Sequence, residues 1–246
     1  MEKKTALFLL KFGNKQNLES LQKGNLYMKN LKFFIELEEK KQKKGMGDAS
    51  EGSLIMNDVK WTLKDIHTDE VILQLDAKKT SLRNNAVLNI PVFCAMLIGE
   101  EDFEQVGEEV DGSIQTNLVF TEQQKEEMVN EFGDHVLVIP ANHFMQRLQE
   151  SLNEQGYQYA TGPVDYLDYS INQQSRFIEF ETGDPKLLFH KDLAFEYQKE
   201  FRLAILNQEI EDYLITNIGD LTDHTALIKS SDLLSGNYGL QITFRK

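Results

Sequence analysis

The chain has 246 residues and a formal net charge of −14, with 41% hydrophobic and 27% charged side chains. These fractions are typical of a globular protein with a sizeable buried core. The acidic charge repels nucleic acid and anionic membranes, so it argues against a protein that binds either through its general surface.

The first half of the chain predicts short strands and helices in alternation. Thr5–Lys11 is apolar enough for a central strand, and a helix over Lys15–Lys23 follows, with Asn14 as its cap. A second strand, Asn25–Met28, precedes Leu31–Glu39, whose pattern fits either a helix or a strand. The remaining strands of this half are expected over Val59–Leu63, Glu70–Leu75 and Val87–Ile98. An exposed acidic loop is expected over Glu100–Gly112.

The second half has two well-marked helices among further strands. Thr121 and Gln124 form a capping box for a helix over Glu122–Glu131. A second helix, which Asn142 is expected to cap and which runs to Gln155, carries one apolar face. Strands are expected over His135–Ile139, Tyr157–Tyr169, Asp212–Thr216, Thr225–Lys229 and Tyr238–Phe244. A further strand is expected to begin at Glu200 and is described below. We predict one α+β domain over residues 1–246, built on a mixed or antiparallel sheet with three or four helices.

Two local features bear on where the protein works. Its one cysteine, Cys94, excludes an internal disulfide and fits a reducing compartment. The apolar run from Ala6 to Leu10 is too short for a signal-peptide core or a membrane span. We therefore expect a cytoplasmic protein that does not act on a membrane. The densest basic run lies beside glutamates and is interpreted as a solvated helix end or loop; it comprises Lys40, Lys41, Lys43 and Lys44.

Several kinds of catalytic centre are not indicated by the residues. The five histidines are scattered without zinc-ligand spacing, so no metal site is predicted. No G-x-S-x-G sequence marks a nucleophilic serine. Cys94 lies in an apolar strand, which is typical of a buried inert thiol.

The most informative stretch is Leu187–Leu206, where charged and aromatic residues lead into an alternating strand. The alternation predicts that Phe201 is buried and that Glu200 and Arg202 lie on the outward face. Residues two apart in an extended segment point to the same side, so Gln198 and Glu200 are able to reach one ligand. A carboxylate there stabilises an oxocarbenium-like cation, and the amide orients an acceptor. The alternative is an ordinary surface ion pair between Glu200 and Arg202.

A second stretch of interest is Gly45–Gly52, which has three glycines in eight residues. Glycine-rich backbone predicts an irregular, mobile loop. Its spacing is not that of a phosphate-binding loop, a dinucleotide fingerprint or an EF-hand. Its two charges, Asp48 and Glu51, either contribute to ligand binding or serve solubility and turn geometry.

The order of these landmarks resembles a widespread prokaryotic and phage family of uncharacterised domains. Members of that family begin with a strand ending in Lys-aromatic, here Lys11-Phe12, followed by G-x-L-Y, here Gly24–Tyr27. An Asp-x-x-Glu-Gly-like loop corresponds to Asp48–Gly52, and an apolar strand with a cysteine corresponds to Val92–Cys94. The family ends in E-K-E-aromatic-R, which is similar to Gln198–Arg202.

The same layout is similar to ADP-ribosyltransferase-like folds. The resemblance implies NAD as the cofactor, with Lys11 at its nicotinamide or ribose side, Tyr27 stacked on it and Glu200 as the catalytic residue. Gln198 is predicted to act beside Glu200. The residues predicted to bind the cofactor are Lys11, Tyr27, Asp48, Glu51 and Arg202.

Each of these residues also has a structural interpretation. Lys11 is typical of a solvated strand end, and Tyr27 fits a core position as well as a ligand platform. Arg202 fits a residue that does no more than orient Glu200.

Hypotheses from two classes follow. One is NAD-dependent ADP-ribosyl transfer in a bacterial or phage conflict system, with a nucleotide-type small molecule as ligand and nucleic acid only as a modified acceptor. The other is a non-enzymatic, acidic, phage-type inhibitor or interaction protein that occupies a basic site on a protein partner, because complementary charge speeds association. A nucleotide-binding sensor that uses the same cleft without turnover is a third hypothesis.

Overall fold

The computed structural model describes residues 5–41 and 45–243, so Lys43 and Lys44 of the predicted basic run lie outside the described residues. The strands are β1 (Ala6–Gly13), β2 (Asn25–Asn30), β3 (Ser53–Lys64), β4 (Val71–Arg83), β5 (Pro91–Gly99), β6 (Phe103–Val110), β7 (Ser113–Leu118), β8 (His135–Pro140), β9 (Tyr159–Pro163), β10 (Asp165–Leu167), β11 (His190–Asp192), β12 (Glu200–Ile205), β13 (Tyr213–Asn217), β14 (Ala226–Lys229) and β15 (Gly239–Thr243). The α-helices are α1 (Lys15–Gln22), α2 (Leu31–Lys41), α3 (Glu122–Phe132), α4 (Ala141–Glu154), α5 (Gln174–Thr182) and α6 (Ser230–Leu234). The short 3-10 helices are η1 (Asn85–Val87), η2 (Glu100–Asp102), η3 (Pro185–Phe189), η4 (Leu193–Gln198) and η5 (Thr222–His224).

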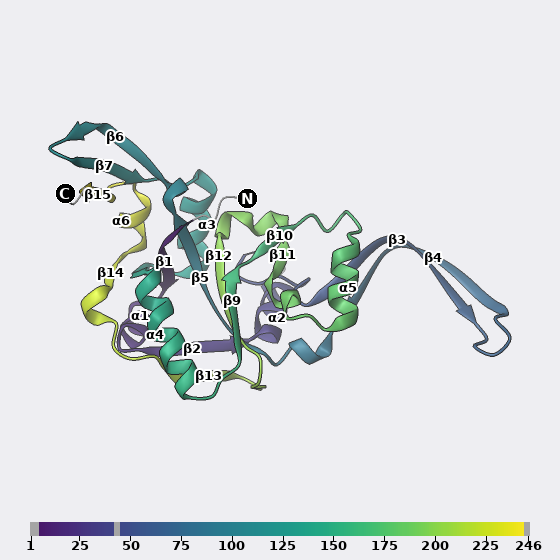
Figure 1. The fold of residues 1–246 in the computed structure, drawn as a ribbon. Helices are drawn as coiled ribbons and strands as arrows, with labels where there is room; N and C mark the ends of the chain where they lie inside the picture. The colour runs from purple at the N-terminus through teal and green to yellow at the C-terminus, as the bar shows by residue number, and fades with distance from the viewer. Residues whose placement is uncertain (1–4, 42–44, 244–246) are drawn as a thin grey trace.

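In the described residues the main sheet has eight strands, and its central path is antiparallel with the order β13-β2-β5-β1-β8-β14 (Figure 1). One edge of β5 pairs with β12, which in turn pairs with β9. The other edge pairs with β2 at residues 91–92 and with β1 at residues 96–99. β1 and β2 therefore diverge from β5, and neither strand pairs with residues 93–95 between them.

The α+β class and the antiparallel main sheet agree with the prediction, but the expected three or four helices are too few. Six α-helices lie in the described residues. The ambiguous stretch after β2 is the helix α2, and the two further helices that the sequence did not predict are α5 and α6. Neither α5 nor α6 has a side chain that caps its first turn, so both lack the usual N-terminal signal, and α6 has only five residues. None of the helices in the described residues is long and apolar enough to cross a membrane.

Helices cover both faces of the sheet, which explains why β1 is continuously apolar rather than alternating. Leu9 packs in a cluster with side chains of α1 and α4. Its neighbour Leu10 packs in a second cluster, with Met128 of α3 and Leu233 of α6. A third cluster joins α2 to β5 and β12. Consecutive residues of a strand point to opposite faces, so β1 is apolar at successive positions from Ala6 to Leu10, before Lys11 interrupts the run.

β12 is buried at all six positions, which contradicts the prediction that alternate residues face solvent. It lies between β5 and β9, and both of its faces are covered. Glu200 and Arg202 are therefore not a surface ion pair. They form part of a buried charged cluster, described below.

Two strand pairs extend away from the main sheet (Figure 1). β3 and β4 form a long hairpin, and β6, β7 and β15 form a separate antiparallel sheet. The latter includes most of the segment predicted as an exposed acidic loop. That segment is exposed, but it is a strand because β6 pairs with β7.

Candidate functional site

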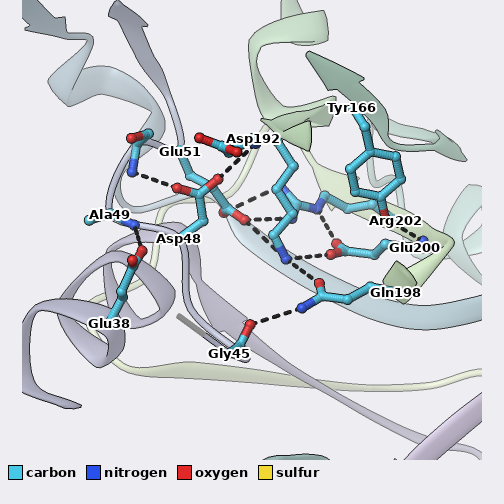
Figure 2. A network of polar contacts seen from close by, with 12 residues as sticks. Glu38, Gly45, Asp48, Ala49, Glu51, Tyr166, Asp192, Gln198, Glu200 and Arg202 are labelled. Carbon is cyan, nitrogen blue, oxygen red and sulfur yellow. Dashed lines mark hydrogen bonds and ion pairs between the residues drawn. The ribbon is translucent and has the colours of Figure 1, made fainter. Parts of the chain in front are cut away.

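Two carboxylates and two cations meet in the interior beside β12 (Figure 2). Glu200 Oε1 accepts a hydrogen bond from Arg202 Nε at 2.7 Å, and Glu200 Oε2 accepts one from Lys191 Nζ at 2.9 Å. Arg202 Nη2 donates to Glu51 Oε1 at 2.9 Å, and Lys191 Nζ lies 3.6 Å from the same oxygen. Glu51 and Lys191 are each 1% exposed and Arg202 is 2% exposed. We refer to these four residues as the charged cluster.

The cluster draws on segments that are far apart in the chain. Glu200 and Arg202 occupy alternate positions of β12, so both point to the same side. Lys191 comes from β11, and Glu51 comes from the turn before β3. The Glu200 backbone N–H donates to the Tyr166 hydroxyl at 2.8 Å, which ties the start of β12 to β10.

Gln198 reaches the cluster by a different route from the one predicted. It ends η4, and Lys199 then adopts a left-handed φ of 43°, so Gln198 and Glu200 are not on one extended segment. Both nevertheless bind the ammonium of Lys191, which donates to Gln198 Oε1 at 2.7 Å. The Gln198 amide nitrogen donates to the Gly45 carbonyl at 2.8 Å. Both ends of this amide are therefore engaged in holding Lys191 and the glycine-rich loop.

The cluster shifts the pKa values of its two carboxylates in opposite directions. Burial alone would raise the pKa of Glu200, but the charges of Arg202 and Lys191 outweigh it and hold that pKa far below the ordinary value. Burial raises the pKa of Glu51, and Arg202 and Lys191 offset that rise in part. Burial alone would lower the pKa of Lys191, but the carboxylates of Glu200 and Glu51 raise it. Glu200 and Lys191 are therefore charged at neutral pH.

A small cavity of about 90 Å³ lies against the cluster. Its polar lining comes from Lys11, Gln198 and all four cluster residues, and the rest is apolar. This volume has room for a few water molecules or a small polar group, but not for a whole nucleotide.

A larger cavity of about 620 Å³ lies next to it. It opens where β1 and β2 diverge, and Tyr27 and Lys29 of β2 form part of its wall. Six residues line both cavities, which makes the two hollows neighbours across a common wall; they are Lys11, Phe12, Phe34, Met46, Cys94 and Phe132.

Lys11 lies at the boundary between the two cavities. Its Nζ donates to the carbonyl of Cys94, one of the three residues of β5, 93–95, that neither β1 nor β2 pairs with. It also lies 4.7 Å from the centre of the Phe93 ring. Burial lowers the pKa of Lys11, and the neighbouring Cys94 and Glu200 partly counter this effect. The interpretation of Lys11 as a solvated strand end is therefore wrong.

Tyr27 lies on the exposed side of the larger cavity and does not contact the cluster. It is 47% exposed, and its ring stacks on that of Tyr213 with 5.4 Å between the ring centres. Lys29 Nζ lies 5.0 Å from the centre of the Phe33 ring and pairs with Asp212. Tyr27 is therefore not a core residue. It stacks on Tyr213, and we refer to these two rings, on β2 and β13, as the aromatic shelf.

Asp48 and Glu51 of the glycine-rich loop are buried, so they do not serve the solubility of the loop. Asp48 accepts hydrogen bonds from the backbone N–H groups of Ser50 and Asp192, at 2.8 and 3.2 Å. It lines neither of the two cavities described above. Asp48 thus braces the loop against β11, whereas Glu51 turns into the cluster.

Lys191 and Tyr166 belong to the site but carry no sequence signal that predicts it. Lys191 stands between His190 and Asp192, a polar triplet that is typical of a surface turn. Its burial follows from the parallel pairing of β11 with β10, which is a long-range feature without a local signal. Tyr166 was noticed only as part of a β-prone aromatic stretch.

The described residues contain no group of three or more His, Cys, Asp or Glu side chains that could hold a metal ion. No family model, curated protein or solved structure significantly matches this chain.

Proposed function

We propose that the two neighbouring cavities bind a nucleotide-type small molecule, with NAD as the first candidate, and that Glu200 acts on it in an ADP-ribosyltransferase-like reaction. The observation that carries the proposal is the shared wall. Lys11 lines both cavities, Tyr27 lines the larger one and Glu200 lines the smaller one. The three residues to which the resemblance assigns NAD binding and catalysis therefore line two neighbouring cavities.

The lining of the larger cavity supports an anionic ligand with planar rings. In a chain of net charge −14, none of the described residues that line this cavity is Asp or Glu. Lys11 and Lys29 supply positive charge, and aromatic side chains supply stacking surfaces. Its volume lies within the usual range for small-molecule sites. A dinucleotide that lies across the shelf would direct one end past Lys11 toward the smaller cavity.

The proposed reaction breaks the bond between nicotinamide and its ribose. The electron pair of that bond leaves with the nicotinamide nitrogen, whose positive charge is thereby neutralised, and positive charge develops at the ribose carbon. A fixed carboxylate beside this carbon stabilises the transition state more than the ground state. Water or an acceptor hydroxyl then forms the new bond and loses its proton to solvent. Glu200 fits the carboxylate role because its low pKa keeps it ionised.

The second candidate, a non-enzymatic acidic interaction protein, is favoured by the pairing of Glu200. Each of its two oxygens already accepts a hydrogen bond from a buried cation. Two carboxylates balance two cations in the cluster, so little net field reaches the cavity. The net charge of −14 also suits a basic partner surface.

Nicotinamide release by the purified protein tests the first candidate. Glu200→Gln is expected to reduce the rate by about a hundredfold or more, the scale of losing one preorganised electrostatic partner. Asp102→Asn is the matched control, because Asp102 pairs with Lys199 beside Glu200 in sequence but lines neither cavity. It should leave turnover within about twofold.

A binding measurement separates ligand recognition from catalysis. Tyr27→Ala removes an exposed ring from the shelf, so it should weaken NAD binding in calorimetry while the fold stays intact. Equal turnover in the wild type and Glu200→Gln would remove Glu200 from the mechanism. Absence of both NAD binding and nicotinamide release, together with tight binding to a basic protein, would favour the second candidate.

A further inference from the structure

The β3–β4 hairpin leaves the body of the protein as an extended arm, residues 53–83 (Figure 1). Strands of 12 and 13 residues reach about 40 Å at the usual rise per residue. The base of the arm is fixed, because Asn57 exchanges backbone and side-chain hydrogen bonds with Asn172 and Tyr169. Beyond Asn57 nearly every residue of the two strands is exposed.

The arm has one apolar face and one polar face. Residues directly opposite each other in an antiparallel pair share a face, and the register pairs Trp61 with Leu75 and Leu63 with Leu73. The three leucines are 57–60% exposed. The alternating positions form the other face, which is polar at Lys60, Thr62, Gln74 and Asp76. Ile72, beside Leu73 where the register shifts, is also exposed, at 64%.

This arm is incomplete as a free structure. An isolated two-stranded hairpin is marginally stable in water, and three or more strands with a covered apolar face are usually needed. Contiguous apolar surface of this kind marks an interaction site. The physical question is which surface covers it.

The charge distribution along the arm identifies the covering surface. The tip half, residues 62–75, carries one base and three acids: Lys64, Asp65, Asp69 and Glu70. The base half carries four bases and two acids: Asp58, Lys60, Asp76, Lys78, Lys79 and Arg83. The tip half is thus net −2, the base half net +2 and the arm neutral, in a chain of −14.

We propose that the arm packs against the arm of a second copy of this chain, antiparallel, about a two-fold axis near the Trp61–Leu75 pair. A two-fold contact is self-complementary, so the acidic tip of each copy, which includes Glu70, lies beside Lys79 of the other. Lys79 shares a face with the Trp61–Leu75 pair, whereas Lys60 and Lys78 lie on the polar face and point away from the contact. The apolar faces then cover each other. The bodies lie at opposite ends, separated by more than the screening length of about 10 Å, so their negative charges do not oppose the contact.

The contact is small, which sets its strength. The face that is free of the body runs from Asn57 to Lys64, about 25 Å, and is two strands wide, about 10 Å, so it covers on the order of 250 Å² per copy. Stable interfaces bury about 800 Å² per partner. The dimer is therefore weak, with a dissociation constant on the order of micromolar or higher.

Sedimentation equilibrium of the full chain, over a series spanning the micromolar range, measures this dimer. Leu73→Glu places a charge on the apolar face and should raise the dissociation constant by about tenfold or more. Thr62→Glu, on the polar face of the opposite strand, is the matched control and should change it little. Circular dichroism of both variants checks that the body is folded.

A charge-reversal experiment separates a second copy from any other partner. Glu70→Lys changes the tip half from net −2 to neutral, and Lys79→Glu changes the base half from net +2 to neutral, so each variant alone should dimerise less well than the wild type. A mixture of the two variants should associate more strongly than either alone, because opposite charges again meet at one end of the contact. Three results would overturn the proposal. They are a wild-type chain that is monomeric at every concentration, a dissociation constant that Leu73→Glu leaves unchanged, and a mixture of the two charge variants that associates no more strongly than either variant alone.

Discussion

Replacing Arg202 with Met removes the cation that joins the two carboxylates of the charged cluster. The side chain is 2% exposed, and it donates to Glu51, to Glu200 and to the Leu188 carbonyl. Its loss leaves Lys191 alone against two buried carboxylates. Breaking a buried ion pair at one partner costs about 3–5 kcal/mol, so we expect the free energy of unfolding to fall by about that amount.

Urea denaturation at pH 7 measures the loss. Lys29→Met is the matched control, because it also removes a cation that pairs with a carboxylate. In this pair the carboxylate, that of Asp212, is largely exposed. Exposed ion pairs contribute about 0–1 kcal/mol. A loss below about 1.5 kcal/mol for Arg202→Met, close to that of the control, would contradict the view that the cluster is desolvated and tightly paired.

A double-mutant cycle with Glu200→Gln tests whether the cost comes from imbalance of charge. The double variant retains Lys191 against Glu51, one cation against one carboxylate. It should therefore cost less than the sum of the two single variants, by about 1–3 kcal/mol. Additive losses would refute the argument, because they would mean that Arg202 and Glu200 contribute independently.

The pH dependence has a definite sign. The folded-state pKa of Glu200 is lowered, so Glu200 contributes stability that is present above the unfolded pKa of about 4.3 and is lost as pH falls below it. Arg202 is one of the two charges that lower this pKa. The difference in unfolding free energy between wild type and Arg202→Met should therefore be largest near neutral pH and shrink below about pH 4.3.

Three other predictions follow from single features of the fold. Burial raises the pKa of Cys94 to about 12, so iodoacetamide at pH 8 should alkylate the native thiol at least about a hundredfold more slowly than the urea-unfolded chain. Gly47→Ala brings its Cβ to 2.2 Å from the Phe34 carbonyl oxygen and should destabilise the protein by about 1–3 kcal/mol or more, whereas Gly162→Ala, which meets nothing within 4 Å, should be tolerated in the same melting assay. Amide exchange in the loop of residues 45–52 should be slower than at the arm tip, because Glu51 and its neighbours are held by hydrogen bonds; equal rates would show that the loop opens freely.

Local signals predicted the elements that depend on local chemistry. The capping box of Thr121 and Gln124 forms as expected at the start of α3. The helix expected up to Gln155 corresponds to α4, whose apolar face is buried in the core. The prediction that Asn142 caps it is wrong, because α4 begins at Ala141 with Pro140 in the cap position. Asn14 caps α1 through its side chain. In each case the residues that decide the structure lie within one or two turns of each other, so a single sequence contains the necessary information.

The charged cluster could be predicted only in part, because its partners are distant in the chain. Glu51 and Arg202 are 151 positions apart, and no local pattern relates them. The alternating pattern of β12 predicts that Arg202 faces solvent. That inference holds only for a strand with one face open to water, and β12 has none. The segment 45–52 covers that face, and its glycines suggested mobility rather than close packing. Gly47 instead approaches α2 so closely that a Cβ has no room.

The burial of four charges has a consequence for both candidate functions. Apolar side chains of similar volume often stabilise a fold as well as a buried ion pair does, so stability alone is a weak explanation for the cluster. The polar groups add directional hydrogen bonds. Through these bonds, Gln198 and Lys191 hold the glycine-rich loop and β12 in one relative position beside the small cavity. A transferase needs that rigidity to keep Glu200 fixed at the ribose carbon. An interaction protein needs it only if the loop itself is recognised. The cluster therefore connects the loop to the cavity in either case, and the turnover of Glu200→Gln relative to Asp102→Asn distinguishes the two uses.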